Sequence, residues 1–234
     1  MKSTSPFYNE IFSTNGQIRP HYAKAFHYWE TVPSKKRQAL YKQSKKFFSG
    51  DYAQDPFPRI LTQNEFDFIS RGVEQRARAI LAFLHDYCIG GTRWQRIMPA
   101  GTLRSMIERH HVSNTLKKLD PDQLAFPYGP DIIRDHTGRW RVVEDSAGVI
   151  GGLGDLLQSH KILYHLVPNF RNILKSSPMN YNDPLNFFTR LAHHFSKKAK
   201  QMCGIPLLYL HSYQEEPDQE TKRLARIFRH VGIE

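Results

Sequence analysis

The sequence is poor in cysteine. Only Cys88 and Cys203 occur among its 234 residues, and they lie far apart. This spacing excludes a Cys-x-x-Cys metal or redox site, and two isolated cysteines do not make a disulfide framework. The first ten residues also lack the apolar core of a signal peptide. We therefore predict a protein of the reducing cytoplasm.

Long apolar runs and readable catalytic signatures are missing as well. No stretch approaches the roughly 18 apolar residues that span a bilayer, so we expect no membrane partner. No glycine-rich loop continues into Gly-Lys-Ser/Thr, and no zinc-finger spacing occurs. The adjacent pairs His110-His111 and His193-His194 are not expected to bind metal, because neighbouring side chains point apart on a helix.

Acidic residues are outnumbered by 33 basic residues to 22, which gives a net charge of +11. A basic balance is typical of proteins with anionic partners, and equally of a solvated basic surface. The charge is dispersed, and its densest cluster, residues 35–46, is interrupted at helical spacing. Nucleic acid is therefore not the expected partner, although a basic nucleic-acid-binding protein stays as one hypothesis.

Aromatic residues are plentiful, and periodicity and capping signals predict a helix-rich chain. Thr62 to Glu65 has the form of a capping box at the start of a long helix. A run of apolar residues at 205–210 is typical of a buried parallel strand. Residues 167–184 contain three prolines and are predicted to form a loop. Helices are expected at residues 21–29, 34–48, 62–90, 155–166, 185–202 and 216–231, and residues 97–118 are expected to form one or two more.

These elements predict an α+β fold in two parts. Residues 1–175 would form a helix-rich region with a β-hairpin, and residues 180–234 would form an αβα segment. One strand with a helix on each side is not a finished sheet, so we expect the sequence to be incomplete as a folding and functional unit. The alternative is a short, self-sufficient variant that pairs its strand elsewhere.

The chemically richest stretch is the predicted hairpin. Strands at 131–135 and 139–145 flank a His-Thr-Gly turn and carry four acids. Magnesium binds a few carboxylates together with phosphate oxygens, and two paired strands can hold carboxylates a few ångströms apart. The pattern predicts a magnesium site, with an exposed acidic hairpin end as the alternative. The four acids are Asp131, Asp135, Glu144 and Asp145.

The strand register decides which acids meet. A three-residue turn places Asp131 opposite Val143, so that Asp145 shares the face of Asp131 and Glu144 points away. One bulge residue would reverse this choice. The residues alone leave both registers open.

A glycine-rich turn, residues 148–154, follows the acids and precedes a helix. Glycines allow close backbone approach, and free amides at a helix N-terminus can bind an anion. We therefore predict that Gly151 and Gly152 contact the phosphates of a cofactor.

Three stretches together resemble the N-terminal half of the circularly permuted ATP-grasp proteins related to glutathionylspermidine-synthase-like ligases. The first is residues 8–22, which end in Arg-Pro-His-Tyr. The second runs from Pro-Arg-Ile at 58–60 to Phe83-Leu84, with Gln-Arg-Ala-Arg-Ala at 75–79. The third is the hairpin, residues 129–145. The likeness covers roughly residues 8–165.

This resemblance implies a ligase that uses ATP and Mg²⁺. A carboxylate would be activated as an acyl phosphate and attacked by an amine, and the substrate would be a small or peptide-like carboxylate and amine pair. The resemblance implies Asp131 and Glu144 as metal ligands, which favours the bulged register. It also places Ser146 among the ligands and assigns Arg134 to the charge of the phosphate or acyl phosphate.

The same resemblance assigns Arg19 and His21 of the opening motif to the ligand site. Two departures point to a second hypothesis, a non-catalytic remnant or binding module. Ser146 stands where the family usually has asparagine, and Gly148 stands where it commonly has arginine. Relatives continue through a Rossmann-like region, of which residues 185–234 resemble the start, into a lysine-bearing lobe. We expect the isolated chain to be inactive and a second polypeptide to supply that lobe.

Overall fold

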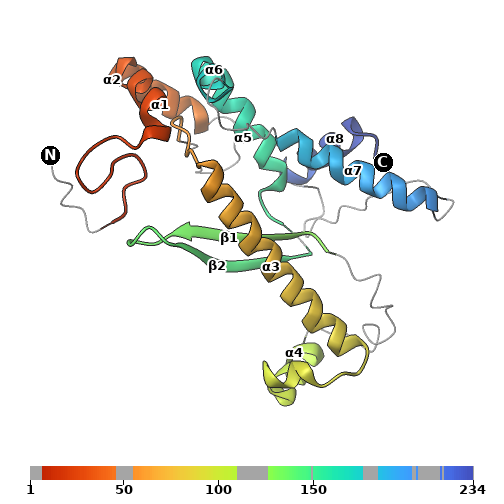
Figure 1. Cartoon of the computed structure of the whole chain (residues 1–234). Helices are drawn as coiled ribbons and strands as arrows, with labels where there is room; N and C mark the ends of the chain where they lie inside the picture. The colour runs from red at the N-terminus through yellow and green to blue at the C-terminus, as the bar shows by residue number, and fades with distance from the viewer. Residues whose placement is uncertain are drawn as a thin grey trace. The chain divides into compact units, whose positions relative to one another are not determined.

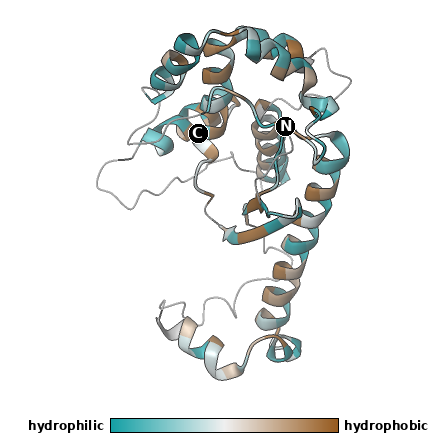
Figure 2. Ribbon diagram, turned by 90° about the vertical axis from the view of Figure 1, so that its left-hand side faces the viewer, coloured by the Kyte–Doolittle hydropathy of each residue, from teal (hydrophilic) through white to brown (hydrophobic). Residues whose placement is uncertain are grey.

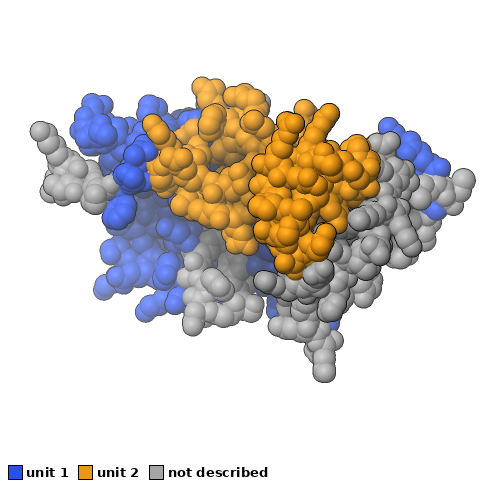
Figure 3. Space-filling view, turned by 90° about the horizontal axis from the view of Figure 1, so that it is seen from below, with its two compact units in different colours: residues 1–63, 136–138, 151–234 blue, residues 64–135, 139–150 orange. Residues whose placement is uncertain are grey.

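The structure, a computed structural model, forms two compact units (Figure 3). Residues 1–63, 136–138 and 151–234 make the first unit, and residues 64–135 and 139–150 make the second. Each unit is considered by itself below. The residues that the structure describes are 7–45, 55–109, 126–148, 150–175, 184–201, 204, 217 and 219–233.

Helices build the first unit, around two clusters of buried apolar side chains. The first core cluster joins α1, α2, α5 and α6 around Tyr22 and Phe170. The second core cluster joins α5, α7 and α8 around Phe188 and Phe228. Burying these aromatic side chains provides most of the driving force for packing. The helices, shown in Figure 1, are α1 (Pro20–Thr31), α2 (Ser34–Ser44), α5 (Leu153–Leu166), α6 (Pro168–Lys175), α7 (Pro184–Gln201) and α8 (Gln219–His230).

Helix α6 shows that the loop predicted over residues 167–184 is wrong in its first half. Pro168 is the first residue of the helix, where its missing N–H is not needed for an intrahelical hydrogen bond. Phe170, two residues on, is completely buried in the first core cluster. Helix α5 packs against both α7 and α8, so residues 151–175 and the last two helices share one compact unit. The division into domains 1–175 and 180–234 stays a prediction.

The second unit combines a long helix with the hairpin. Helix α3 (Gln63–Cys88) begins directly after Thr62, as the capping box predicts, and carries polar and apolar residues along its whole length (Figure 2). It is followed by the 3₁₀ helix η2 (Arg93–Arg96) and by α4 (Ala100–Arg109). Strands β1 (Tyr128–Arg134) and β2 (Trp140–Ala147) form an antiparallel two-stranded sheet.

The predicted α+β class is thus confirmed: the described chain is rich in helix and holds one small antiparallel sheet. The strand predicted at residues 205–210 lies outside the described residues, so the Rossmann-like segment stays a prediction. None of the described helices has the length and apolar character that crossing a membrane would require.

Candidate functional site

A bulge sets the register of the hairpin. Ile132 pairs with Val142, the register then shifts by one residue, and Asp131 pairs with Glu144. Val143 is therefore the extra residue of β2. The bulged register is the one present, and the plain count from the turn is wrong. Because directly opposed residues of an antiparallel pair share a face, the carboxylates of Asp131 and Glu144 project from the same side of the sheet.

The bulge gives the sheet two unlike faces. Asp131 and Glu144 are exposed, whereas Ile132 and Arg134 on the opposite face are partly covered. Ser146 lies two residues after Glu144, so it belongs to the same face as the two acids and is half-buried. The face that bears Asp131, Glu144 and Ser146 is called the acid face below.

Helix α3 binds the face opposite the acid face through two ion pairs. Arg134 Nη2 lies 2.6 Å from Glu65 Oε1, and Arg76 Nε donates to Asp145 Oδ1 at 2.8 Å. Glu65 and Arg76 are separated by about 16 Å along the helix. Arg134 and Pro130, the strand partner of Asp145, are separated by about 13 Å along β1. The two ion pairs therefore join α3 to the hairpin at two separate places, and α3 crosses the strands obliquely (Figure 1).

The carboxylate of Asp145 takes part in the contact between the hairpin and α3. Each of its carboxylate oxygens accepts a hydrogen bond from Arg76, and the hydroxyl of Tyr128 donates a third hydrogen bond, to Oδ1. The bond from Arg76 and then that from Tyr128 lower the pKa of Asp145 to about 2. Desolvation and the neighbouring carboxylate raise the pKa of Tyr128, and the carboxylate also raises the pKa of Arg76. Asp145 is therefore a structural anion rather than an available ligand.

The other three acids of the hairpin are likewise either paired with protein groups or without a described partner. Asp135 accepts the backbone N–H of Arg139 at 2.9 Å and the side-chain Nε of Arg141 at 2.9 Å. Within the described part of the chain, Asp131 and Glu144 have neither an ion-pair nor a hydrogen-bond partner. They are thus the two hairpin carboxylates that face each other and are free to bind a cation.

Asp131 and Glu144 alone are too few ligands for a metal site made only of protein groups. Among the described residues, no group of three or more His, Cys, Asp and Glu side chains could hold a metal ion. One or two carboxylates completed by phosphate oxygens and water are nevertheless what Mg²⁺ commonly takes at nucleotide sites. The donor set of Asp131, Glu144 and the Ser146 hydroxyl fits Mg²⁺ bound together with a phosphate-bearing ligand.

Arg134, predicted to be catalytic, is not brought together with these acids. Its side chain is 8% exposed, is paired with Glu65, and lies over the Trp140 ring with the guanidinium carbon 4.0 Å from the ring centroid. It belongs to the face that α3 contacts. These contacts give Arg134 the role of holding the sheet against the helix, and its catalytic role stays a prediction.

Residues 151–154 of the glycine turn belong to the first unit. Gly152 is the N-cap residue of α5, with a φ of 80° that suits glycine. The backbone N–H of Gly154 donates to Glu220 Oε1 at 3.3 Å, so a carboxylate from α8 already lies at this helix N-terminus. A Cβ on Gly151 or Gly152 would meet nothing within 4 Å. Phosphate binding by these two glycines stays a prediction.

The opening motif is tied into the first unit by local contacts. Arg19 is the N-cap residue of α1; its Nε donates to the carbonyl of Asn9 at 3.2 Å, and its guanidinium lies 4.6 Å from the Tyr8 ring centroid. The His21 ring is half-buried and lies 4.7 Å from that of Tyr22. These contacts fold the segment onto α1, and the ligand roles of Arg19 and His21 stay predictions.

Residues 58–208 match the family described as circularly permuted ATP-grasp type 2, and this match covers more than half of the chain. The chain belongs to this family. The matched region contains α3, the hairpin and the glycine turn, so the acid face lies within the ATP-grasp part of the chain.

Three relatives carry the likeness along most of the chain. A Frankia casuarinae protein named "Putative glutamate--cysteine ligase 2-2" is 28% identical over 179 residues, which are 69% of this chain and 20% of that protein. An uncharacterized Synechocystis protein is 27% identical over 195 residues, 74% of this chain and 40% of the relative. An uncharacterized Mycobacterium leprae protein is 26% identical over 180 residues, which are 69% of this chain and 31% of the relative. The chain thus spans a fifth to two fifths of the length of these relatives.

The role of Arg76 and Tyr128 was not predicted from the sequence. A usable signal exists for Arg76, since it follows Glu65 by eleven residues and therefore lies on the same face of α3. Two charges of opposite sign on one helix face indicate a charged partner surface. Tyr128 gives no such signal, because its hydroxyl finds Asp145 only after the bulge has set the register.

Proposed function

We propose that this chain carries the magnesium-binding hairpin of an ATP-dependent carboxylate–amine ligase. The observation that supports this most directly is the pairing of Asp131 with Glu144, two exposed acids without a described protein partner, within a matched ATP-grasp region. A ligase whose relatives include a protein named for glutamate–cysteine ligation would join a carboxylate to an amine at the expense of ATP.

In this proposal Asp131, Glu144 and Ser146 hold Mg²⁺ against the phosphates of ATP. When bound, the ion neutralises charge on the transferring phosphoryl group. The bulge keeps both acids on one face, and Arg76 keeps Asp145 away from it. The carboxylate substrate would take the γ-phosphoryl group of ATP, with release of ADP, to become an acyl phosphate. The amine would then displace inorganic phosphate to form the amide.

A direct metal-binding experiment tests the site without requiring turnover. Mn²⁺, added to the ¹⁵N-labelled chain, should broaden the amide signals around Asp131 and Glu144. D131N and E144Q should each remove this broadening. D135N makes the same charge change in the same hairpin at an acid that is already paired, and it should leave the broadening in place. Broadening that persists in both D131N and E144Q would refute the proposed ligands.

Trapping with hydroxylamine tests the chemistry. Acyl phosphates react with hydroxylamine to give hydroxamates, so the chain with Mg-ATP and glutamate should form hydroxamate if it holds all that activation needs. The departures at Ser146 and Gly148 motivate a second candidate, a binding module without catalysis. Intact Mn²⁺ binding with no ATP consumption, in the presence of glutamate and cysteine, would favour that module over a ligase active as this chain.

A further inference from the structure

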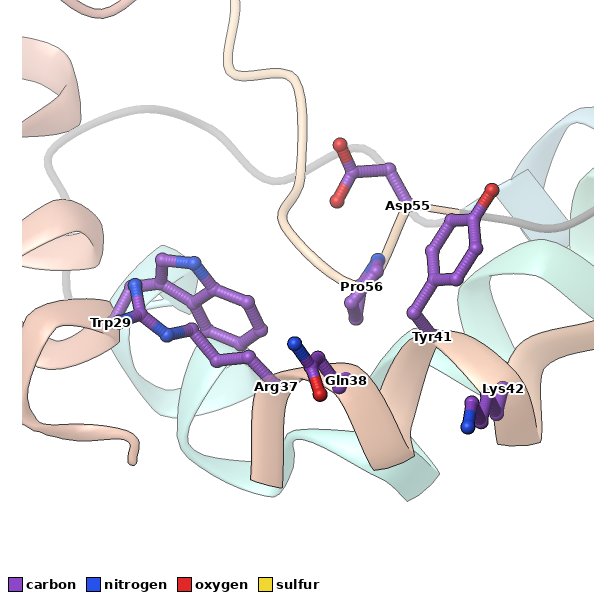
Figure 4. Close-up of a pocket in the computed structure, with 7 residues that line it drawn as sticks. All are labelled: Trp29, Arg37, Gln38, Tyr41, Lys42, Asp55 and Pro56. Carbon is purple, nitrogen blue, oxygen red and sulfur yellow. The ribbon is translucent and has the colours of Figure 1, made fainter. Parts of the chain in front are cut away.

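A hollow of about 360 Å³ opens beside helix α2, within the first unit and separate from the hairpin. Its volume is in the range of small-molecule sites. Figure 4 shows two aromatic rings, Trp29 and Tyr41, on opposite sides of the hollow, with the ring of Pro56 between and behind them. The lining residues are Trp29, Arg37, Gln38, Tyr41, Lys42, Asp55 and Pro56.

One aromatic wall is rigid and the other is exposed. The Trp29 ring packs against Phe57 and Phe170, with ring centroids 5.9 and 5.8 Å apart, so its position is fixed by the first core cluster. Tyr41 is 47% exposed, although it is a large aromatic residue. Pro56 is buried and forms the base. Two rings that flank an apolar base offer stacking surfaces to a flat ligand.

Two basic side chains, Arg37 and Lys42, line the hollow together with one acidic side chain, Asp55, so that basic groups are in excess among the described lining residues. In the described part of the chain, no ion pair is made by Arg37, Lys42 or Lys45, whose Nζ lies 6.0 Å from the Tyr41 ring centroid. Helix α2 has no acidic residue. Asp55, the acid among the described lining residues, accepts the backbone N–H of Phe57 at 2.9 Å.

We propose that this hollow binds a small aromatic anion, a planar ring joined to a phosphate or carboxylate group. The ring would stack between Trp29 and Tyr41, and the anionic group would pair with Arg37 and Lys42. A neutral aromatic ligand would leave the cations unpaired, and a ring-free anion would leave the apolar walls in water. All of these residues lie in the first unit, so the site stands independently of the magnesium proposal.

An NMR titration with 1-naphthyl phosphate tests the site on the whole 234-residue chain. We expect a Kd below about 1 mM. Inorganic phosphate, which lacks the ring, and 1-naphthol, which lacks the charge, should each bind at least about tenfold more weakly. Titration with 1-naphthoate then shows whether a carboxylate serves as well as a phosphate.

Matched variants locate the binding. K42Q and Y41S should each weaken 1-naphthyl phosphate binding by about threefold or more, since one ion pair or one stacking surface is lost. K36Q makes the same charge change on an exposed residue of α2 that does not line the hollow, and it should change the Kd by less than about twofold. The proposal is overturned if 1-naphthol binds as tightly as 1-naphthyl phosphate, or if K36Q weakens binding as much as K42Q.

Discussion

Replacing Tyr22 with phenylalanine removes one oxygen atom from the interior of the first unit. Tyr22 is 1% exposed, and its hydroxyl oxygen accepts the backbone N–H of Ile60 at 2.9 Å. Ile60 is itself 4% exposed, so neither water nor another described group replaces the lost acceptor. The ring stays, and with it the stacking on Phe57 at 6.1 Å between centroids. The variant therefore removes the buried hydroxyl, and with it the acceptor of the Ile60 N–H, while it keeps the aromatic ring.

A buried N–H left without an acceptor costs about 1–3 kcal/mol. For a chain of this size that corresponds to a fall in Tm of about 2–4 °C per kcal/mol. Urea unfolding followed by circular dichroism should show a lower midpoint with an unchanged slope, since the surface exposed on unfolding does not change. Mn²⁺ binding at the hairpin should stay as in the wild type.

Tyr28 provides the matched control. Its ring packs edge-to-face on Phe170 at 5.6 Å, it is half-buried, and no described group hydrogen-bonds its hydroxyl. Y28F should stay within about 0.5 kcal/mol of the wild type. Equal stabilities of Y22F and Y28F would refute the structural role of the Tyr22 hydroxyl. If Y22F were as stable as the wild type but no longer bound Mn²⁺, the Tyr22 hydroxyl would have a role in ligand binding rather than in stability.

Two further predictions concern other contacts of the fold. G154A would place a Cβ 2.7 Å from the backbone oxygen of Glu220, so it should lower the free energy of unfolding, measured in urea, by about 1–3 kcal/mol. The control is G151A, whose added Cβ would have no atom within 4 Å and which should change that free energy by less than about 0.5 kcal/mol. Equal losses in the two variants would contradict the close contact at Gly154. The pKa of Asp145, about 2, lies below the ordinary value of about 3.9, so its contact with Arg76 should be fully present above pH 4 and be lost as the pH falls toward 2. An NMR titration of the hairpin should show this midpoint rising in R76M, and an unchanged midpoint would contradict the assignment.

Much of the hairpin could be predicted from its residues, but its register could not. The Gly138 turn and the flanking β-branched residues define two strands and a three-residue connection, and Gly138 has the positive φ that this turn needs. The bulge leaves no such mark, because Val142 and Val143 are alike and either suits either face of an exposed strand. Only the family resemblance selected the right pairing.

The loop predicted around Pro168 is wrong because contacts distant in the sequence decide the structure there as well. The sequence predicts a loop at Pro168, because a proline usually interrupts a helix. The same residue begins α6, since the apolar residues that follow it, Phe170 and Ile173, are spaced to reach the first core cluster. Local signals establish where a helix can start, and burial by residues distant in the sequence decides whether it forms.

The division of labour between Glu144 and Asp145 shows how such distant contacts create a candidate site. These neighbours have nearly the same chemistry, and their side-chain types alone give no reason to prefer either. Helix α3 supplies that reason: Arg76 binds the acid that points toward it and leaves the other acid facing Asp131. The bulge at Val143 and the arginine on α3 therefore act together, because a one-residue change of register would present Glu144 to Arg76 and Asp145 to the acid face.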